Sequence, residues 1–207
     1  MLEIAPGVFH FPACLDQAAQ AALADEIVEV IAAAPLYVST MPKTGAPMSV
    51  RMTNCGALGW VSDKAQGYRY EARHPKTGEP WPAMPPRLLQ LWDELARYHR
   101  PPEACLVNVY DEKARMGLHQ DRDEADLAAP IFSLSLGADC RFRLGGTRRG
   151  DRAIAFALSS GDALVLSGPA RMRYHGVDRI LPTVDASLPP ALAAFGVRVN
   201  LTLRRVT

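Results

Sequence analysis

The chain lacks the features that would place it in a membrane or outside the cell. No stretch approaches the roughly 18 consecutive apolar residues that a spanning helix needs. Residues 1–6 lack the basic and apolar regions of a secretory leader. No Cys-x-x-Cys pair is present, so the sequence indicates neither a zinc knuckle nor a redox dithiol. The four cysteines stand singly, at Cys14, Cys55, Cys105 and Cys140. We therefore expect reduced thiols in a cytoplasmic protein that makes no membrane contact.

The chain also lacks an excess of charge, internal repeats and low-complexity segments. Its 23 basic and 22 acidic residues give a formal net charge of +1. Any affinity for nucleic acid must therefore come from a local basic patch and not from bulk charge. The 207 residues are 48% hydrophobic and 22% charged, which suits one large globular domain and excludes a disordered, collagen-like or coiled-coil chain.

Two helices are predicted in the first half of the chain. Apolar residues recur at helical spacing over 13–34, and Pro35 then ends the pattern. A second apolar stripe runs over 86–98, where Pro85-Pro86 can open a helix.

The segment 37–82, between these helices, is rich in glycine and proline. It also holds Trp60, Tyr68, Tyr70 and Trp81. Because glycine and proline mark turns while aromatic side chains need something to pack on, we expect short strands or hairpins that form a mobile cover. Pro101-Pro102 then marks a boundary, so we divide the chain into 1–100, with helices and cover, and 101–207, with the core.

Beyond residue 102 the pattern is that of short strands separated by glycine-containing turns. Predicted strands cover 105–110, 117–121, 131–136, 141–144, 153–158, 163–167, 171–175 and 197–204. So many short strands in one half of the chain predict a barrel or a jelly roll.

The last predicted strand alternates strictly between apolar and polar residues. Val197, Val199, Leu201 and Leu203 share one face, and the opposite face carries Arg198, Asn200, Thr202 and Arg204. One interpretation is a surface strand with a solvated face. The other is a polar-lined barrel interior, where two guanidinium groups would require an anion. On the strand 105–110, Asn108 and Tyr110 likewise share a face and need polar partners.

A possible metal site follows from three residues. His119 and Asp121 are two apart on a predicted strand, so both project to the same side. His175 lies 54 residues after Asp121. Two histidines and one carboxylate form the facial triad of non-heme Fe(II) oxygenases. Arg198, 23 residues further on, would suit a dicarboxylate cosubstrate.

Taken together, these segments resemble the AlkB family of Fe(II)- and 2-oxoglutarate-dependent nucleic-acid dealkylases. The resemblance covers about 48–207 and rests on Leu106-Val107-Asn108-Val109-Tyr110, Leu118-His119-Gln120-Asp121-Arg122-Asp123-Glu124, Tyr174-His175-Gly176 and Arg198-Val199-Asn200-Leu201-Thr202-Leu203-Arg204. Upstream, Gly59-Trp60 and Gly67-Tyr68-Arg69-Tyr70 are similar to the nucleotide-recognition lid of the bacterial members. The resemblance implies an α+β, mainly β fold: a double-stranded β-helix (jelly-roll) core with supporting N-terminal helices and a β-hairpin lid.

The resemblance also implies a role for each residue of the core site. His119, Asp121 and His175 would hold Fe(II) and would be the catalytic centre. 2-Oxoglutarate and O2 would be the cosubstrates. Residues implied for 2-oxoglutarate are Asn108, Tyr110, Arg198, Asn200, Thr202 and Arg204. Of these, Arg198 matches the partner of the far carboxylate, and Arg204 the arginine near the metal-bound one.

Five further residues match substrate contacts of the family: Trp60, Tyr68, Asp123, Glu124 and Arg149. Trp60 would stack on the flipped base. Asp123 would accept a hydrogen bond from its exocyclic amino group, and the negative charge would favour a cationic methylated base. Glu124 is either a second contact or a solvated loop charge. A basic surface that would bind the nucleic-acid strand is predicted from Arg141, Arg143, Arg148, Arg149, Arg152, Arg171 and Arg173.

The implied reaction is oxidative demethylation of N-alkylated bases such as 1-methyladenine and 3-methylcytosine, with release of formaldehyde, succinate and CO2. The expected partner of the monomeric enzyme is alkylated single-stranded DNA, with RNA and duplex DNA left open. Two alternatives remain: an oxygenase of the same type acting on a protein or a small molecule, and a catalytically silent nucleic-acid-binding module. The segment 182–196 is longer than the family pattern, and we expect a surface loop with one helical turn there.

Overall fold

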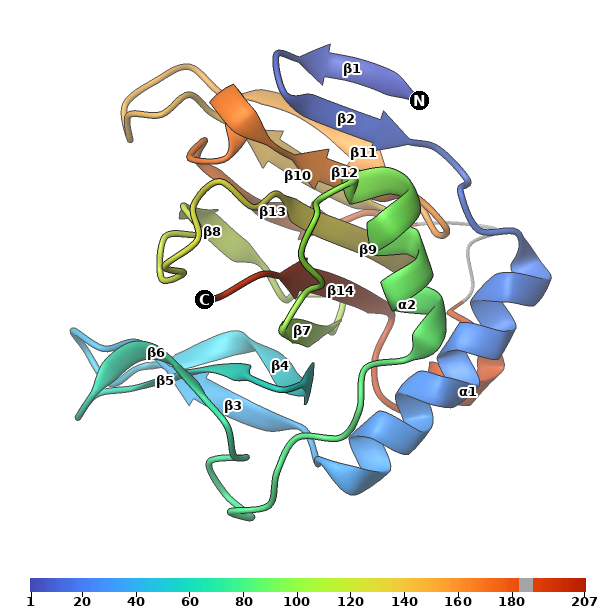
Figure 1. Ribbon diagram of the computed structural model, residues 1–207, viewed down its shortest axis with the longest axis vertical. Coiled ribbons are helices and arrows are strands. Elements are labelled where there is room, and N and C mark those ends of the chain that lie inside the picture. The colour runs from blue at the N-terminus through green and yellow to red at the C-terminus, as the bar shows by residue number, and fades with distance from the viewer. Residues whose placement is uncertain (183–187) are drawn as a thin grey trace.

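Two β-sheets pack face to face in the computed structural model, which describes residues 1–182 and 188–207 (Figure 1). Within these residues the larger sheet has eight strands, in the order β1-β2-β12-β9-β14-β7-β4-β3, and the smaller sheet has four, in the order β11-β10-β13-β8. The strands of the larger sheet are β1 (Leu2–Ala5), β2 (Val8–Phe11), β3 (Tyr37–Thr40), β4 (Pro47–Gly56), β7 (Ala104–Tyr110), β9 (Ile131–Gly137), β12 (Ala163–Leu166) and β14 (Arg198–Arg204). Those of the smaller sheet are β8 (Met116–His119), β10 (Cys140–Leu144), β11 (Ile154–Leu158) and β13 (His175–Ile180).

From β7 onward the chain passes back and forth between the two sheets. Strands β7, β9, β12 and β14 lie in the larger sheet, whereas β8, β10, β11 and β13 lie in the smaller one. Apolar side chains from both sheets, such as Ile131 and Phe142, form one buried cluster between them. The fold is therefore the predicted mainly-β jelly roll.

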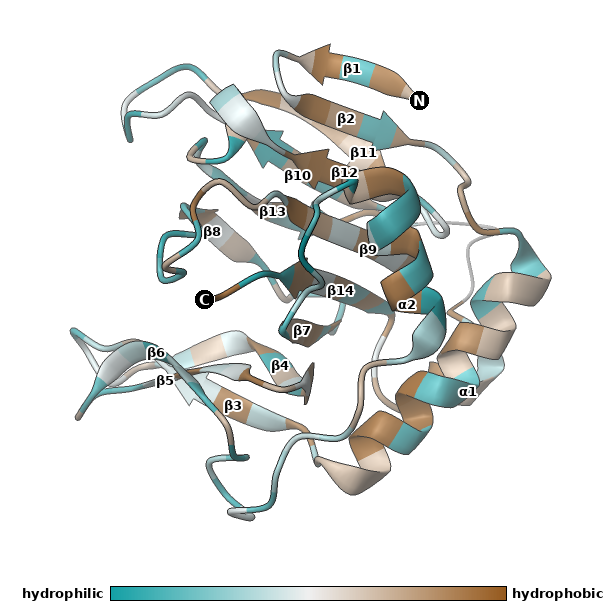
Figure 2. Ribbon diagram, in the orientation of Figure 1, coloured by the Kyte–Doolittle hydropathy of each residue, from teal (hydrophilic) through white to brown (hydrophobic). Residues whose placement is uncertain are grey.

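Helices cover the outer face of the larger sheet (Figure 1). Helix α1 (Gln17–Ala33) buries Leu23, Ile27 and Ile31 in a cluster with the apolar residues of β7, β9 and β14. Figure 2 shows this apolar stripe along α1. The helix begins later than residue 13 because the carboxylate of Asp16 caps it, accepting a hydrogen bond from the Ala19 N–H at 2.8 Å. No helix in the described part of the chain is long and apolar enough to cross a membrane.

The second predicted helix, 86–98, changes its winding halfway. Helix α2 (Pro86–Leu91) is followed by a π-helical turn, η1 (Trp92–Ala96), and Arg97 ends it with φ at 52°. The Trp92 indole is fully buried, and its N–H donates to the Arg100 carbonyl at 3.1 Å. The widened turn brings the largest side chain of this segment onto the core.

The predicted strand over 171–175 is wrong. A 3-10 turn, η2 (Gly168–Ala170), precedes this segment, and β13 begins only at its last residue, His175. Arg171 is buried, and its guanidinium donates to the main-chain carbonyls of Ala129, at 2.8 Å, and Asp121. Residues 171–174 thus lead from η2 into β13 as a turn that carries a buried arginine, and not as a paired strand.

The hairpin β1–β2 extends the larger sheet next to β12 and was not predicted. Its turn contains Pro6-Gly7, and Gly7 has φ at +77°. A side chain at Gly7 would also meet the Ser167 carbonyl oxygen at 2.3 Å. A Pro-Gly pair between two short apolar runs is a hairpin signal, so the sequence did contain the information.

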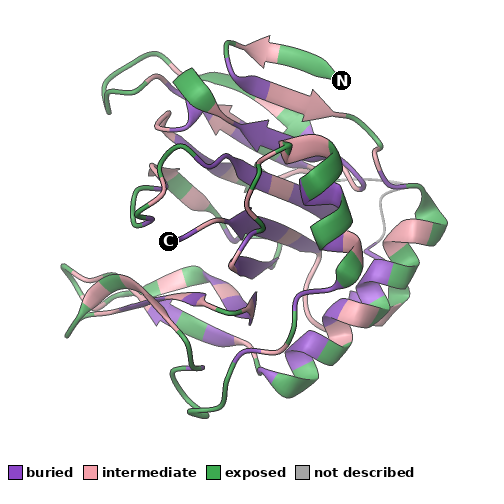
Figure 3. Ribbon diagram, viewed as in Figure 1, coloured by how far each residue is buried: buried purple, intermediate pink, exposed green. Residues whose placement is uncertain are grey.

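A second hairpin, of β5 (Gly59–Asp63) and β6 (Gly67–Glu71), forms a separate two-stranded sheet beside β3 and β4 (Figure 1). Figure 3 shows that its residues are less buried than the central strands of the larger sheet. Strands β1 to β4, from the first part of the predicted division, pair into the same sheet as strands of the second part. The division at residue 100 stays a prediction.

The long connection before β14 is only partly a surface loop. Residues 183–187 of this prediction lie outside the described residues. A helical turn is present at η3 (Pro190–Leu192), as expected. Leu188 and Leu192, however, are buried in the core cluster beside α1. The described part of the connection thus contributes apolar side chains to the core.

Candidate active site

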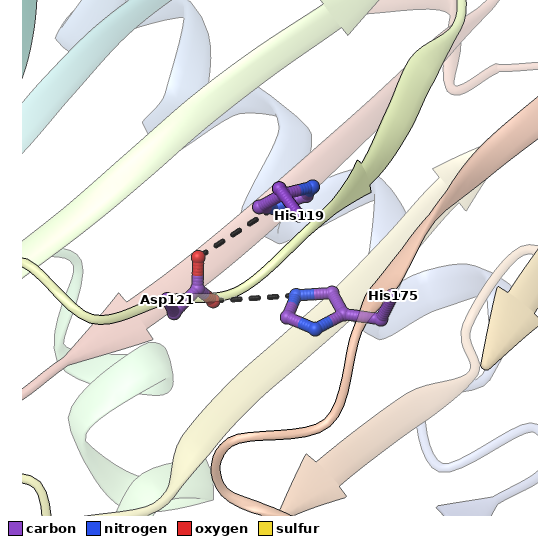
Figure 4. A group of neighbouring side chains, drawn as sticks. All are labelled: His119, Asp121 and His175. Atoms are coloured by element: carbon purple, nitrogen blue, oxygen red, sulfur yellow. Dashed lines mark ion pairs between the residues drawn. The ribbon is translucent and has the colours of Figure 1, made fainter. Parts of the chain in front are cut away.

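Two histidines and one aspartate meet where the ends of two neighbouring strands come together. His119 ends β8, His175 begins β13, and the antiparallel register places these two residues opposite each other. Asp121 follows β8 by two residues. One nitrogen or oxygen atom from each of the three side chains lies within 4.8 Å of the other two (Figure 4). The spacing seen in the sequence therefore becomes a three-atom cluster in the fold.

Main-chain carbonyls fix the orientation of both imidazole rings. His119 Nδ1 donates to the Gly117 carbonyl at 2.9 Å, and His175 Nδ1 donates to the Arg173 carbonyl at 3.0 Å. With the proton on Nδ1, each Nε2 presents a lone pair toward Asp121, at 3.5 Å for His119 and 3.3 Å for His175 (Figure 4). This is the tautomer that leaves Nε2 free to bind a metal.

Asp121 is the residue of this cluster that most clearly needs a further partner. Its side chain is buried, and Oδ2 receives no hydrogen bond in the described part of the chain. Burial would raise the pKa of Asp121, but the charge of Arg204 outweighs it and holds that pKa well below the usual range. An ionised carboxylate whose two oxygens each face an imidazole lone pair suits a divalent cation. Two nitrogens and one oxygen are the donor set of a non-heme Fe(II) centre, which leaves coordination positions for other ligands.

A buried arginine without an acidic partner lies at another point of the same cavity wall. Arg198, on β14, is 1% exposed. It donates to the carbonyls of Ala138 at 2.8 Å and Leu158 at 3.3 Å and to the Ser135 hydroxyl at 2.6 Å. Its Nε has no acceptor, and no ion pair forms with it among the described residues. A buried guanidinium that meets only neutral groups suits a carboxylate ligand.

Side chains beside Arg198 are held in place along the facing strands. Asn200 Nδ2 donates to the Ser133 hydroxyl at 2.8 Å, and the Thr202 hydroxyl donates to Asn200 Oδ1, also at 2.8 Å. Asn108 and Tyr110 of β7 stand opposite Asn200 and Arg198 in the register. All of these residues line the cavity, so the polar face of β14 is an interior surface and not a solvated one.

Arg204, the second arginine of this strand, has a different environment. Its Nη2 donates to Asp121 Oδ1 at 2.7 Å, and its Nη1 donates to Glu124 Oε1 at 2.9 Å and to the Tyr70 hydroxyl at 3.1 Å. Arg204 lines the cavity, whereas Glu124 does not. The Glu124 side chain is fully buried and also pairs with Arg171, at 3.0 Å. Glu124 is therefore not a solvated loop charge, and its side chain lies outside the cavity lining. Its contact with substrate stays a prediction.

The remaining predicted substrate residues lie around the mouth of the cavity. Trp60 stacks on Tyr68, with ring centroids 5.4 Å apart and planes 25° apart, and its indole N–H donates to Asp123 Oδ2 at 2.9 Å. Tyr68 and Asp123 are exposed. The Arg149 guanidinium lies 5.6 Å from the centre of the Tyr174 ring.

The cavity joins these groups into one site. It measures about 750 Å³ and is lined by the three clustered residues, by Arg198 and by Trp60, among others. Methionines complete its wall: Met41, Met48, Met52 and Met116. Every substrate-contact and cosubstrate residue expected from the sequence lines it, except Glu124.

The sequence analysis missed two residues behind the site. Arg171 was expected on a basic surface and is instead buried against Glu124 and the Asp121 main chain. Tyr70 was expected only as part of the cover, yet its hydroxyl donates to Glu124 Oε1 at 2.5 Å. No local pattern distinguishes a buried arginine from an exposed one, because its partners come from distant segments.

The chain matches the family model described as the 2OG-Fe(II) oxygenase superfamily over residues 7–204. It is 52% identical over 204 residues to the alpha-ketoglutarate-dependent dioxygenase AlkB homolog of Caulobacter vibrioides, which covers 99% of this chain and 90% of the relative. A DNA N(6)-methyladenine demethylase of Arabidopsis thaliana, ALKBH1D, is 41% identical over 108 residues, covering 50% of this chain and 24% of the relative. Among solved structures, OsALKBH1 superposes with a TM-score of 0.80 at 26% identity, over 99% of both chains.

Proposed function

This chain belongs to the AlkB family of Fe(II)- and 2-oxoglutarate-dependent dioxygenases, and from that membership we propose that it removes N-linked alkyl groups from nucleic-acid bases by oxidation. The expected substrates are bases such as 1-methyladenine and 3-methylcytosine in single-stranded DNA. Formaldehyde, succinate and CO2 are the products. Action by a monomer and a cytoplasmic location belong to the same proposal.

One observation carries the proposal: the His119, Asp121 and His175 cluster opens onto the cavity that also exposes Arg198, which has no acidic partner among residues 1–182 and 188–207. A divalent metal and a dicarboxylate would therefore share one enclosed space. Fe(II), once bound by the three side chains, supplies the activation of O2 that accompanies oxidative decarboxylation of 2-oxoglutarate. Arg198 holds the far carboxylate of the cosubstrate, and the fixed polar wall of β7 and β14 orients its remaining atoms.

The mouth of the cavity supports recognition of a base. Trp60, already stacked on Tyr68, offers an aromatic surface to a base that has left its strand. Asp123 keeps capacity to accept a hydrogen bond from an exocyclic amino group, because the Trp60 indole uses only one of its roughly four acceptor positions. A carboxylate at this point favours the positive charge of an N-methylated adenine or cytosine. Arg149 provides positive charge for the phosphate backbone.

Formaldehyde release tests the proposal. The purified protein is incubated with Fe(II), ascorbate, 2-oxoglutarate and a single-stranded DNA oligonucleotide that carries one 1-methyladenine. A matched reaction omits 2-oxoglutarate, and a second replaces the oligonucleotide by its unmethylated form. We expect formaldehyde only in the complete reaction. Succinate formed at the same rate with either oligonucleotide would indicate that the oxygenase acts on a protein or a small molecule instead. Absence of both products from iron-loaded protein would overturn the enzymatic proposal.

A further inference from the structure

Glu124 lies at the centre of a buried charge cluster behind the candidate metal site. Its Oε2 accepts from Arg171 Nη2 at 3.0 Å, and its Oε1 accepts from Arg204 Nη1 at 2.9 Å and from the Tyr70 hydroxyl at 2.5 Å. The side chain is wholly buried, and the charge of Arg204 holds the pKa of Glu124 below its usual value although burial opposes this. Glu124 is therefore an ionised group that water does not screen.

Arg204 connects this carboxylate to Asp121. A guanidinium is planar and rigid, so the position of one terminal nitrogen determines that of the other. Nη1 is held by Glu124 and Tyr70, while Nη2 donates to Asp121 Oδ1 at 2.7 Å. Its Nε has no acceptor within the described ranges 1–182 and 188–207. Glu124 and Tyr70 thus set the angle at which Arg204 reaches the aspartate.

Arg171 makes a second connection, to the main chain of the same aspartate. Its guanidinium donates to the Asp121 carbonyl and to the Ala129 carbonyl, and it pairs with Glu124. Both the side chain and the backbone of Asp121 are therefore held by arginines that share Glu124. The two arginines are balanced by two carboxylates, Asp121 and Glu124, so loss of one carboxylate leaves a buried positive charge facing an incoming cation.

We propose that Glu124 is a positioning residue for the metal site: through Arg204 and Arg171 it fixes the orientation of Asp121 and keeps the surrounding charge low enough for a divalent cation to bind. Tyr70, on β6, attaches the hairpin β5–β6 to this carboxylate. The inference rests on the proposed function, because it assigns Asp121 to a metal. It gives Glu124 a role distinct from the substrate contact suggested by the sequence.

The chain contains a matched cluster that lacks the connection to Asp121. Asp126, two residues after Glu124, accepts from the Tyr98 hydroxyl at 3.0 Å and from Arg100 at 3.5 Å. It likewise combines a carboxylate with a tyrosine and an arginine, and the carboxylate lies on the same loop as Glu124. Its side chain is mostly buried, with 14% exposed. Substitutions in the two clusters can therefore be compared one for one.

The test measures Mn²⁺ binding by calorimetry, together with the electron paramagnetic resonance spectrum of the bound ion, in metal-free protein without any substrate. Glu124→Gln should weaken Mn²⁺ binding by about tenfold or more and alter the spectrum of the remaining complex. Asp126→Asn should leave the affinity within about twofold of wild type, because its charge pair lies nearer to solvent. Thermal unfolding of each variant confirms that it is folded.

A milder pair of variants covers the case in which Glu124→Gln does not fold. Tyr70→Phe removes the hydroxyl that donates to Glu124 and accepts from Arg204. We expect about threefold weaker Mn²⁺ binding, because these two hydrogen bonds act on Asp121 only through Arg204 and all the charges remain. Tyr98→Phe should not change it. Equal Mn²⁺ affinity in wild type and Tyr70→Phe, or equal losses in both members of a pair, would overturn the positioning role. A wild-type protein that binds no Mn²⁺ would overturn the proposed function as well.

Discussion

Arg198 and Arg204 stand six residues apart on the same face of β14, and both are almost completely buried. Arg204 is surrounded by two carboxylates and a tyrosine hydroxyl. Among the residues that the structure describes, Arg198 donates only to carbonyls and to one serine hydroxyl. Two buried cations of one strand therefore differ in whether the described residues supply their counter-charge.

The difference separates a structural role from a ligand-binding one. Breaking a buried ion pair by removing one partner costs several kcal/mol of folding free energy. A buried charge without a counterion instead carries a desolvation cost, which a bound ligand of opposite charge can offset. Arg204 thus already has its counter-charges, whereas Arg198 has none among residues 1–182 and 188–207 and suits the carboxylate of a ligand. The contact of Arg204 with 2-oxoglutarate stays a prediction. The sequence pattern, Arg-x-x-x-x-x-Arg on a polar face, predicts both as anion contacts and does not distinguish them.

The largest effect should come from removing a ligand of the candidate metal site, such as Asp121, which also accepts a hydrogen bond from Arg204. In Asp121→Ala, and equally in His119→Ala, two remaining protein ligands cannot hold the iron well, so formaldehyde release should fall to background. His99→Ala, which removes an exposed histidine outside the cavity lining, serves as the control. Turnover retained in either ligand variant would contradict the assignment.

The two arginines should differ in what they contribute to the stability of the metal-free protein. Arg204→Met leaves Asp121 and Glu124 without their shared partner, and we expect a loss of about 3–5 kcal/mol in the free energy of unfolding by urea. Arg198→Met removes a cation that has no anionic partner in the described part of the chain, so the loss should be about 1 kcal/mol or less. Equal losses would mean that Arg198 is paired in a way that the neutral contacts do not reveal.

Of the two arginines, Arg198 should matter more when 2-oxoglutarate binding, and not stability, is measured in the folded proteins. Arg198→Met should raise the 2-oxoglutarate concentration needed for half-maximal succinate release by about 30-fold or more, because a buried charge-assisted contact with the far carboxylate is lost. Ser135→Ala, which removes one hydroxyl beside Arg198, should cost much less. An unchanged requirement in Arg198→Met would place the anion elsewhere in the cavity.

The same contrast applies to the adjacent carboxylates, because Asp123 is exposed at the cavity mouth and Glu124 is buried behind it. Asp123→Ala should reduce the preference for a methylated over an unmethylated oligonucleotide by about tenfold, as expected for one hydrogen bond to a charged group. Oligonucleotide-independent succinate release should not change. Competition between the two oligonucleotides provides the measurement, and an identical preference would remove Asp123 from base recognition.

An exposed arginine should show the smallest effect. Arg149 lines the cavity mouth, and if it contacts one phosphate, Arg149→Ala should lower the slope of log affinity against log salt by about 0.7 for a single strand. Arg87→Ala, on α2 and outside the cavity lining, should leave that slope unchanged. Fluorescence anisotropy of a labelled oligonucleotide at several salt concentrations gives both slopes.

The fold and the candidate metal cluster could be anticipated from local patterns. Alternating residues on β14, turn glycines between short strands and the His119-Gln120-Asp121 spacing each reflect the geometry of a few consecutive residues. The prediction of a strand over 171–175 was wrong because the contacts made there involve distant residues. Arg171 binds carbonyls that belong to residues 121 and 129, and no pattern within the segment reports those bonds.

By itself, then, the sequence determined which residues share a face and which chemical groups are present. The tertiary structure alone decided which of these groups neutralise one another. Strands β6, β8 and β14 and the loop after Asp121 come together only in the fold, and there Tyr70, Glu124 and Arg204 meet. Charge pairing inside a protein depends on distance and on the exclusion of water, and both are set by contacts between distant segments.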